Sequence, residues 1–92
     1  MDRLAGFRKE LNEIDASLIE LLGRRFKIIR DVGAYKKGAN IPMMQSKRVD
    51  EVKDRCARMG EEYDLDGAFI RSLYALIIDE ACRIEDTIID KQ

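Results

Sequence analysis

The chain has 92 residues, of which 46% are hydrophobic and 38% are charged, with one proline, no tryptophan and no histidine. This length predicts a single domain over residues 1–92, and the scarcity of helix breakers favours helices over sheets. Seventeen basic residues against eighteen acidic ones give a net charge of −1, so no global field attracts nucleic acid or a membrane. The absence of histidine removes the commonest metal ligand and general base, which argues against zinc and catalytic-triad chemistry.

From the N-terminus, apolar residues recur in alternating steps of three and four, at Leu4, Phe7, Leu11, Ile14, Leu18, Leu21, Ile28, Val32 and Tyr35. This spacing predicts one helix over about residues 3–37, with an a/d heptad seam along it. Such a helix is ~50 Å long, whereas a compact globule of this size has a radius of gyration near ~12 Å. The remaining ~50 residues cannot cover it. We therefore predict an intertwined homodimer in which the long helices pair.

A loop and two shorter helices complete the predicted fold. Gly38 and Pro42 mark the end of the first helix, and Ser46 is expected to cap a second helix over about residues 46–59. Gly60 ends that helix, and Asp66 is expected to cap a third helix that runs to about residue 89. The predicted apolar faces consist of Val49, Val52, Cys56 and Met59 on the second helix and Ile70, Leu73, Ile77, Ala81, Ile84 and Ile88 on the third. The fold class is therefore all-α, a three-helix protomer with a long N-terminal helix.

The two cysteines, Cys56 and Cys82, form no CxxC motif. Both lie on apolar helical faces, which indicates buried free thiols in a reducing compartment. No signal peptide is visible after Met1, and no apolar run approaches the roughly 18 residues of a membrane-spanning helix. We therefore expect a cytoplasmic protein that binds neither membrane nor nucleic acid.

One position of the heptad seam is not apolar. Arg25 stands at an a position, where the seam otherwise holds leucine or valine. A guanidinium inside a helix interface is costly unless an anion pairs with it. The residues leave two interpretations open: a register-setting arginine paired with Glu20 or a partner carboxylate, or an anion site within the bundle.

Other charged residues fit an anion site but do not establish it. Arg8 and Lys36 occupy e positions beside the seam, and Arg48 lies in the first turn of the second helix, where the helix dipole disfavours a cation. On one helix Arg8 and Arg25 are ~25 Å apart, so Arg8 can approach Arg25 only from an antiparallel partner helix. Read alone, these cations are solvated surface charges. Glu85, on the shoulder of an apolar face, is read alone as a partly exposed structural carboxylate.

The same positions belong to an ordered set of motifs that covers the chain from about Leu4 to Ile89. The set comprises Phe7-Arg8, Ile14-Asp15, Leu21-Leu22-Gly23-Arg24-Arg25, Val32-Gly33-Ala34-Tyr35-Lys36, Ile41-Pro42, Arg48-Val49, Leu65-Asp66 and Leu76-Ile77-Ile78-Asp79-Glu80. In this order and spacing the chain resembles the all-helical, type II chorismate mutases. The resemblance implies a protomer that dimerises around its first helix and a [3,3] pericyclic rearrangement of chorismate to prephenate. That reaction uses no metal, cofactor, nucleophile or obligatory proton transfer, so the lack of histidine is no objection to it.

The resemblance also assigns roles to the charged positions. It implies that Arg25 and Arg8 of the partner subunit hold the two carboxylates of the substrate. Lys36 would donate to the ether oxygen and to a carboxylate, and Arg48 would support the substrate. Glu85 matches the second partner of the ether oxygen. Restraint of the reactive conformer and stabilisation of charge on that oxygen would supply the catalysis.

The chain departs from the family pattern at four substrate-binding positions. Gln45 stands where many bacterial members have Asp, Val49 where they have Glu, and Ala81 where they have a small hydroxyl residue. Glu85 replaces the usual Gln, as in fungal relatives. A carboxyl group donates a hydrogen bond only when protonated, so we expect activity to fall as pH rises and Glu85→Gln to flatten the profile.

These departures leave the substrate open. Three segments are similar to the subgroup that rearranges 4-amino-4-deoxychorismate in antibiotic pathways, namely Met43-Met44-Gln45, Arg48-Val49 and Cys82-Arg83-Ile84-Glu85-Asp86. Electrostatics alone does not favour the amino substrate, because Gln45 offers an ammonium group only a neutral oxygen. Val49 also resembles the isochorismate pyruvate lyases, whose loop lengths fit less well. A non-catalytic helical dimer module is the remaining alternative; it should gain stability from Arg25→Leu, whereas a mutase should lose activity.

Overall fold

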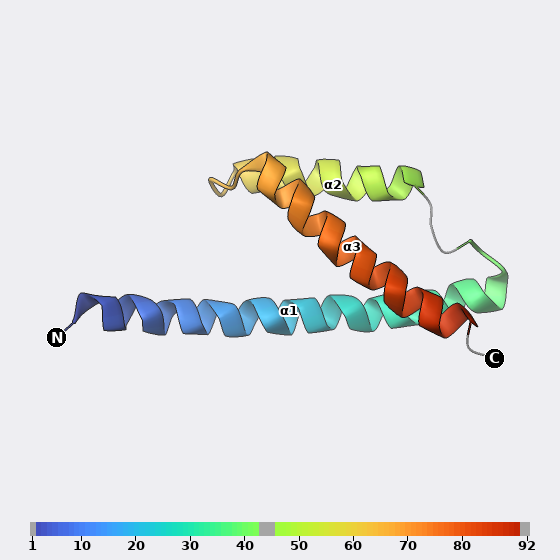
Figure 1. The fold of residues 1–92 in the computed structure, drawn as a ribbon, viewed down its shortest axis with the longest axis horizontal. Helices are drawn as coiled ribbons and strands as arrows, with labels where there is room; N and C mark the ends of the chain where they lie inside the picture. The colour runs from blue at the N-terminus through green and yellow to red at the C-terminus, as the bar shows by residue number, and fades with distance from the viewer. Residues whose placement is uncertain (1, 43–45, 91–92) are drawn as a thin grey trace.

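The computed structural model describes residues 2–42 and 46–90. Within them the chain forms three helices, α1 (Arg3–Ala39), α2 (Ser46–Glu61) and α3 (Gly67–Asp90) (Figure 1). No strand occurs in these two ranges. The predicted all-α class, with a long N-terminal helix followed by two shorter ones, is therefore confirmed, and the predicted ends lie within two residues of the observed ones.

Local polar contacts set the ends of the helices. The Asp2 carboxylate accepts a hydrogen bond of 3.0 Å from the backbone N–H of Leu4, and the Asp66 carboxylate accepts one of 3.0 Å from Phe69. Asp66 is thus the predicted cap of α3. Gly38, by contrast, lies inside α1, and the helix ends at Asn40, whose backbone is left-handed (φ 57°) and whose N–H donates to the Lys36 carbonyl. Asparagine tolerates this conformation because its short polar side chain bonds locally, so no glycine is needed.

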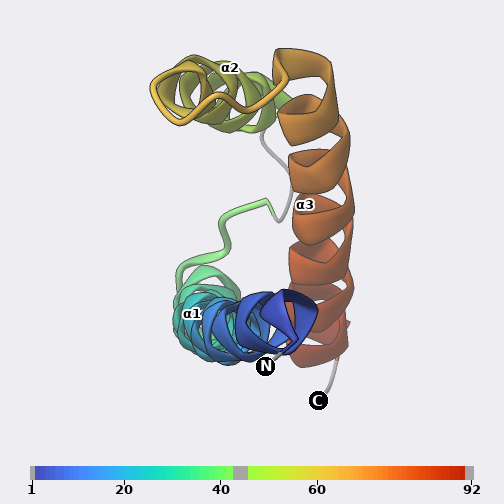
Figure 2. The same cartoon turned by 90° about the vertical axis from the view of Figure 1, so that its left-hand side faces the viewer.

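The three helices form an open arrangement in which α3 bridges the other two. Helix α1 packs on α3 and α3 packs on α2, while the backbones of α1 and α2 do not approach each other closely in the described ranges (Figure 2). The radius of gyration is 16.7 Å and the longest dimension is 58 Å. A compact chain of this length has a radius near ~12 Å, so α1 extends well beyond the part of the protein that covers it.

A small apolar core lies between α2 and α3. Its buried members are Val52, Cys56, Ala57 and Ile70, with the half-buried Tyr74 and Ile78 packed against them. Met59, expected on the same face, is 51% exposed instead. The reason is that α3 starts beside the last turn of α2 and approaches Gly60, where a Cβ atom would lie only 3.2 Å from Ile70 Cγ1.

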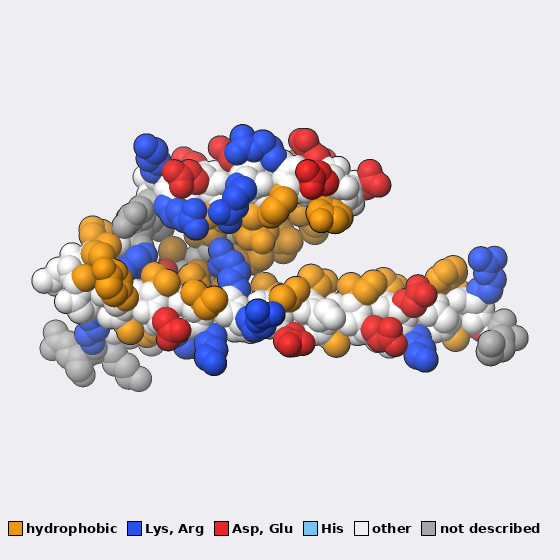
Figure 3. All heavy atoms as spheres, turned by 180° about the vertical axis from the view of Figure 1, so that it is seen from behind, with side chains coloured by type: hydrophobic (Ala, Val, Ile, Leu, Met, Phe, Trp, Pro, Cys, Tyr) orange, Lys and Arg blue, Asp and Glu red, His pale blue; other side chains and the backbone are white. Residues whose placement is uncertain are grey.

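The predicted seam of α1 is exposed in the single chain. All five d positions are more than half exposed, with values of 51%, 55%, 55%, 62% and 68% for Phe7, Ile14, Leu21, Ile28 and Tyr35. Hydrophobic side chains line this edge of α1, which faces the gap below α2 (Figure 3). The face that α1 turns to α3 shares only the half-buried a positions Arg25 and Val32 with this seam. Its other half-buried or buried residues are Leu22, Phe26, Ile29, Gly33 and Lys36.

No helix in the described ranges has the length and apolarity needed to cross a membrane.

Candidate active site

A pocket of about 350 Å³ is lined by side chains from all three helices. Its walls are Arg25, Ile29, Val32 and Lys36 from α1, Arg48, Val49 and Val52 from α2, and Ile78, Ala81, Cys82 and Glu85 from α3. The volume is within the range of small-molecule sites. The pocket therefore brings together six residues that the sequence analysis assigned to the site, namely Arg25, Lys36, Arg48, Val49, Ala81 and Glu85.

An ion pair fixes one end of the pocket. Lys36 Nζ of α1 lies 2.8 Å from Glu85 Oε1 of α3, and the two side chains are only 17% and 6% exposed. The interpretation of Glu85 as a partly exposed residue is thus wrong, because α1 and α3 approach closely beside it. A Cβ atom on Gly33 would already touch the backbone and side chain of Glu85 at 3.4 Å. The described residues give Glu85 Oε1 no well-directed hydrogen bond beyond this ion pair.

The guanidinium of Arg25 lies at the other end of the pocket without an anionic partner. Its Nη1 atom is buried and has no hydrogen-bond partner among the described residues. The predicted alternative of a salt bridge to Glu20 is absent from the single chain, and Glu20 is exposed. The guanidinium faces the ring of Tyr74, with Cζ 5.8 Å from the ring centre. Arg25 is thus a partly desolvated cation without a carboxylate partner among the described residues.

Helix α2 contributes a more exposed cation and an apolar wall. Arg48 pairs with Glu51 at 3.8 Å, but both side chains are nearly 60% exposed, so this ion pair fixes Arg48 weakly. Val49 is half-buried and lines the pocket one residue further on. A side chain at Arg48 can therefore turn towards a ligand without breaking a strong contact.

Cys82 lines the pocket, although its sequence position predicts only a buried thiol. It is a free, half-buried thiol one turn before Glu85 on α3. Its i,i+3 spacing from Glu85 is the sequence feature that places both residues on the same side of the helix. Burial raises the pKa of the Cys82 thiol, the negative charges of Glu85 and Asp79 raise it further, and Lys36 opposes them. The thiol is therefore neutral near pH 7 and serves as part of the wall. The sequence also does not identify three apolar wall residues as part of the site, namely Ile29, Val52 and Ile78. In sequence, an apolar pocket wall looks the same as the core face of a helix.

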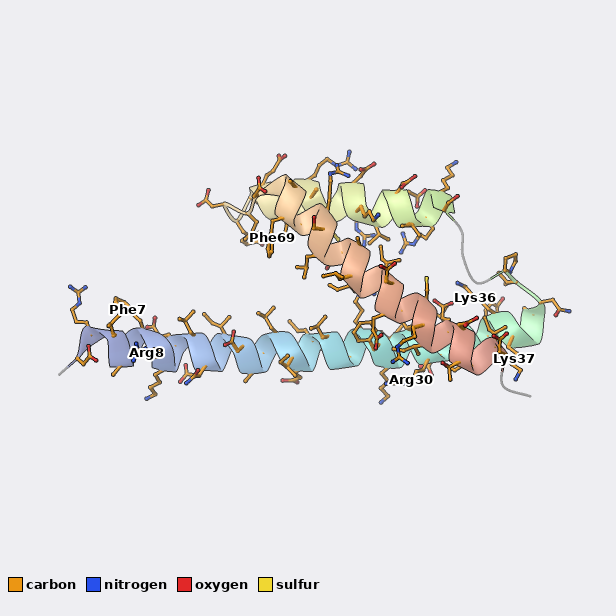
Figure 4. The ribbon with its side chains drawn as sticks, in the orientation of Figure 1. Phe7, Arg8, Arg30, Lys36, Lys37 and Phe69 are labelled. Carbon is orange, nitrogen blue, oxygen red and sulfur yellow. The ribbon has the colours of Figure 1, made fainter. Side chains whose placement is uncertain are left out.

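Arg8 is not brought to the pocket by the single chain, and Gln45 cannot be compared with the prediction. Arg8 lies on the exposed N-terminal part of α1, far along the helix from Lys36 (Figure 4). Gln45 lies outside the described residues, as do its neighbours Met43 and Met44.

The electrostatics of the pocket favour a small anion. Three cationic side chains and one carboxylate line it, so the site carries an excess of positive charge between apolar walls. Positive groups held in a partly desolvated cleft bind anions and stabilise negative charge that develops on them. No group of three His, Cys, Asp or Glu residues suited to a metal ion occurs in the described part of the chain.

Comparison of the sequence with known proteins identifies the family of the chain. Residues 7–86 match the family model of type II chorismate mutases. The chain is 37% identical to a 4-amino-4-deoxychorismate mutase of Streptomyces venezuelae, covering 99% of this chain and 88% of that protein. It is 39% identical to a 4-amino-4-deoxychorismate mutase of Streptomyces pristinaespiralis (92% and 66% covered) and 34% identical to an isochorismate pyruvate lyase of Pseudomonas aeruginosa (82% and 73% covered). The chain belongs to the type II chorismate mutase family.

Proposed function

We propose that the protein catalyses the [3,3] rearrangement of chorismate to prephenate in the pocket between α1, α2 and α3. The observation that carries this proposal is the convergence of Arg25, Lys36 and Arg48 around a cleft whose one carboxylate is Glu85. A pericyclic rearrangement of a dianion needs its reactive conformer held and its breaking C–O bond stabilised by positive charge. Fixed cations between apolar walls meet both needs without a nucleophile, a metal or a cofactor.

The contacts within the site support a division of roles. Arg25 has a buried Nη1 with no partner in the described ranges, so its guanidinium is suited to receive a carboxylate. Lys36 is held by Glu85 at 2.8 Å, which fixes its ammonium group at the end of the pocket, where it would donate to the ether oxygen. Glu85 would approach the same oxygen, to which a carboxyl group donates only when it is protonated. Arg48, with only a weak exposed partner, would close on the substrate.

We further propose that the functional unit is an intertwined homodimer with shared active sites. Five d-position side chains along the full length of α1 are more than half exposed, and a second copy of α1 is the simplest cover for a heptad seam. Paired antiparallel, the partner helix would bring Arg8 of the partner subunit towards the pocket, where it would hold the second carboxylate.

The test is direct. Purified protein is mixed with chorismate, the loss of the diene ultraviolet absorbance is followed, and the product is identified by mass and by its acid-catalysed conversion to phenylpyruvate. Prephenate formation that is lost in Arg25→Leu supports the proposal. No consumption of chorismate, 4-amino-4-deoxychorismate or isochorismate would overturn it in favour of a non-catalytic helical dimer.

A second candidate substrate is 4-amino-4-deoxychorismate, and two observations favour it. The Streptomyces relatives named above, at 37% and 39% identity, are both mutases of that compound. In this chain Val49, an apolar residue, lines the pocket at the position where, by the family resemblance, many bacterial members have a glutamate. Competition of chorismate, the amino analogue and isochorismate for one preparation separates the cases. Preferred consumption of the amino analogue would reassign the substrate, and pyruvate released from isochorismate would reassign the reaction.

A further inference from the structure

We propose that Tyr74 is a positioning residue for this reaction, whose ring holds the Arg25 guanidinium ready to receive a substrate carboxylate. The inference rests on the proposed function and deepens it. Arg25 comes from α1 and Tyr74 from α3, so the contact crosses the interface that builds the pocket. Tyr74 is not itself part of the pocket wall, and Arg25 is the charged wall residue that its ring faces.

The geometry is that of a cation held over an aromatic face. Arg25 Cζ lies 5.8 Å from the centre of the Tyr74 ring, inside the range of about 6 Å for such contacts. In the described ranges no carboxylate pairs with Arg25, and its buried Nη1 has no hydrogen-bond partner. A flexible side chain in that situation needs another restraint to keep one position. The ring supplies it without accepting a conventional hydrogen bond from the guanidinium.

The ring is anchored on its other side. Tyr74 is half-buried and packs against the core cluster of Val52, Cys56, Ala57 and Ile70. The pKa of Tyr74 is raised, first by burial and then by its hydrogen bond with the Cys56 thiol, while the nearby guanidinium of Arg25 opposes this. The phenol is consequently neutral at physiological pH, and its attraction for Arg25 is that of a ring and not of a phenolate. The core between α2 and α3 thus connects to Arg25 through one side chain.

The ring and the hydroxyl make separable contributions. Tyr74→Phe keeps the ring over Arg25 and loses only the contact with Cys56. Tyr74→Leu keeps an apolar side chain against the cluster and loses the ring. Ile70→Val is the matched control, because Ile70 belongs to the same cluster and does not line the pocket. If Tyr74 acts through Arg25, only the leucine variant should alter carboxylate binding.

Steady-state kinetics on the preferred substrate provide the first test. We expect Tyr74→Leu to raise KM about tenfold with a smaller change in kcat, and Tyr74→Phe and Ile70→Val to stay within about twofold of the parent. A loss that is merely structural would reduce the folded fraction, lowering kcat at constant KM in Tyr74→Leu and Ile70→Val alike. That pattern, or a leucine variant identical to the parent, would overturn the proposal.

A second readout is independent of turnover. In protein labelled with ¹⁵N-arginine, the ring current of Tyr74 should displace the side-chain Nε–Hε resonance of Arg25 in the parent and in Tyr74→Phe. The displacement should vanish in Tyr74→Leu. An Arg25 resonance that is the same in all three proteins contradicts the contact, whether or not the protein is a mutase. If the parent shows the expected resonance pattern but turns over no substrate, the proposed function is wrong and the contact between Tyr74 and Arg25 is still supported.

Discussion

The two ends of α1 have the same apolar repeat and opposite surroundings. Every described residue before Leu22 is exposed, whereas Leu22, Arg25, Phe26, Ile29 and Gly33 beyond it are half-buried or buried. The difference is the presence of α3, which packs on the C-terminal part of α1. A heptad seam therefore indicates that a helix face needs a cover, without indicating which segment supplies it.

The packed end shows that α3 uses only one side of the seam, because the a positions Arg25 and Val32 are half-buried there while the d positions stay exposed. Ile28 and Tyr35 occupy d positions in this part of α1 and are still 62% and 68% exposed. The buried and half-buried residues lie on the a side of the seam and on the helix face next to it, so the d side of α1 is left open by its own chain. In the proposed dimer, the second copy of α1 would cover this open side along its whole length.

The largest effect should follow from a charge placed in the open seam. Leu11 is 56% exposed in the single chain, so Leu11→Glu would cost little in a monomer. In the proposed dimer it buries an unpaired carboxylate, at a cost on the order of 3 kcal/mol or more. We expect loss of the dimer in sedimentation equilibrium and loss of mutase activity, because Arg8 of the partner subunit leaves the site.

Asn12→Glu is the matched control for Leu11→Glu, since it introduces the same charge one residue later at an exposed b position. It should leave both the mass and the rate unchanged. An unaltered mass in Leu11→Glu would show that the open face is not the dimer interface.

Arg25→Leu tests the packed end of α1. We expect kcat/KM to fall by about 10²–10³, the usual cost of removing one preorganised charge-stabilising donor. The free energy of unfolding should stay equal or rise, because a guanidinium with no anionic partner in the described ranges leaves a partly desolvated position. Initial rates and urea unfolding measure the two quantities. Arg30→Leu, on an exposed position outside the pocket, is the control and should change neither. Undiminished activity in Arg25→Leu would exclude the proposed carboxylate site.

These contrasts also explain what the sequence predicts well. The length of α1 follows from its periodicity, and Arg25 is found because it interrupts that periodicity. Glu85 was misjudged because the rotation of α3 depends on its partners. The buried face of α3 contains Ile70, Ala81 and Glu85. Leu73, which the sequence predicts on the apolar face of this helix, is 36% exposed. Periodicity shows which residues share a face of a helix, but not the angle at which a packing partner meets that face. The roles assigned to Arg8 and Gln45 stay predictions.

A smaller and pH-dependent effect is expected at the Lys36–Glu85 pair. Groups facing Glu85 are Lys36 from α1, Cys82 from α3 and, across the pocket, Arg48 from α2. A carboxyl group donates to the ether oxygen only in its neutral form, so the proposed role of Glu85 makes the rate depend on pH. We therefore expect kcat/KM to fall with increasing pH in the parent. Glu85→Gln keeps an amide donor at every pH, so its profile should be flat and about tenfold higher than the parent at the alkaline end. A parent activity that rises steadily from about pH 5 to 9 is incompatible with this role.

The smallest effects come from two glycines that contrast a packed and an open environment. At Gly60 a Cβ atom would lie 3.2 Å from Ile70 Cγ1 and 3.3 Å from Leu65 Cβ, so Gly60→Ala must displace the start of α3 and should cost about 1 kcal/mol. At Gly23 nothing lies within 4 Å of such an atom, and Gly23→Ala should gain about 0.5–1 kcal/mol from helix propensity. Urea unfolding midpoints at one protein concentration compare them. Gly23 is at an f position, away from the a/d seam. A destabilising Gly23→Ala would therefore mean that the partner covers a wider face of α1 than a heptad pairing requires.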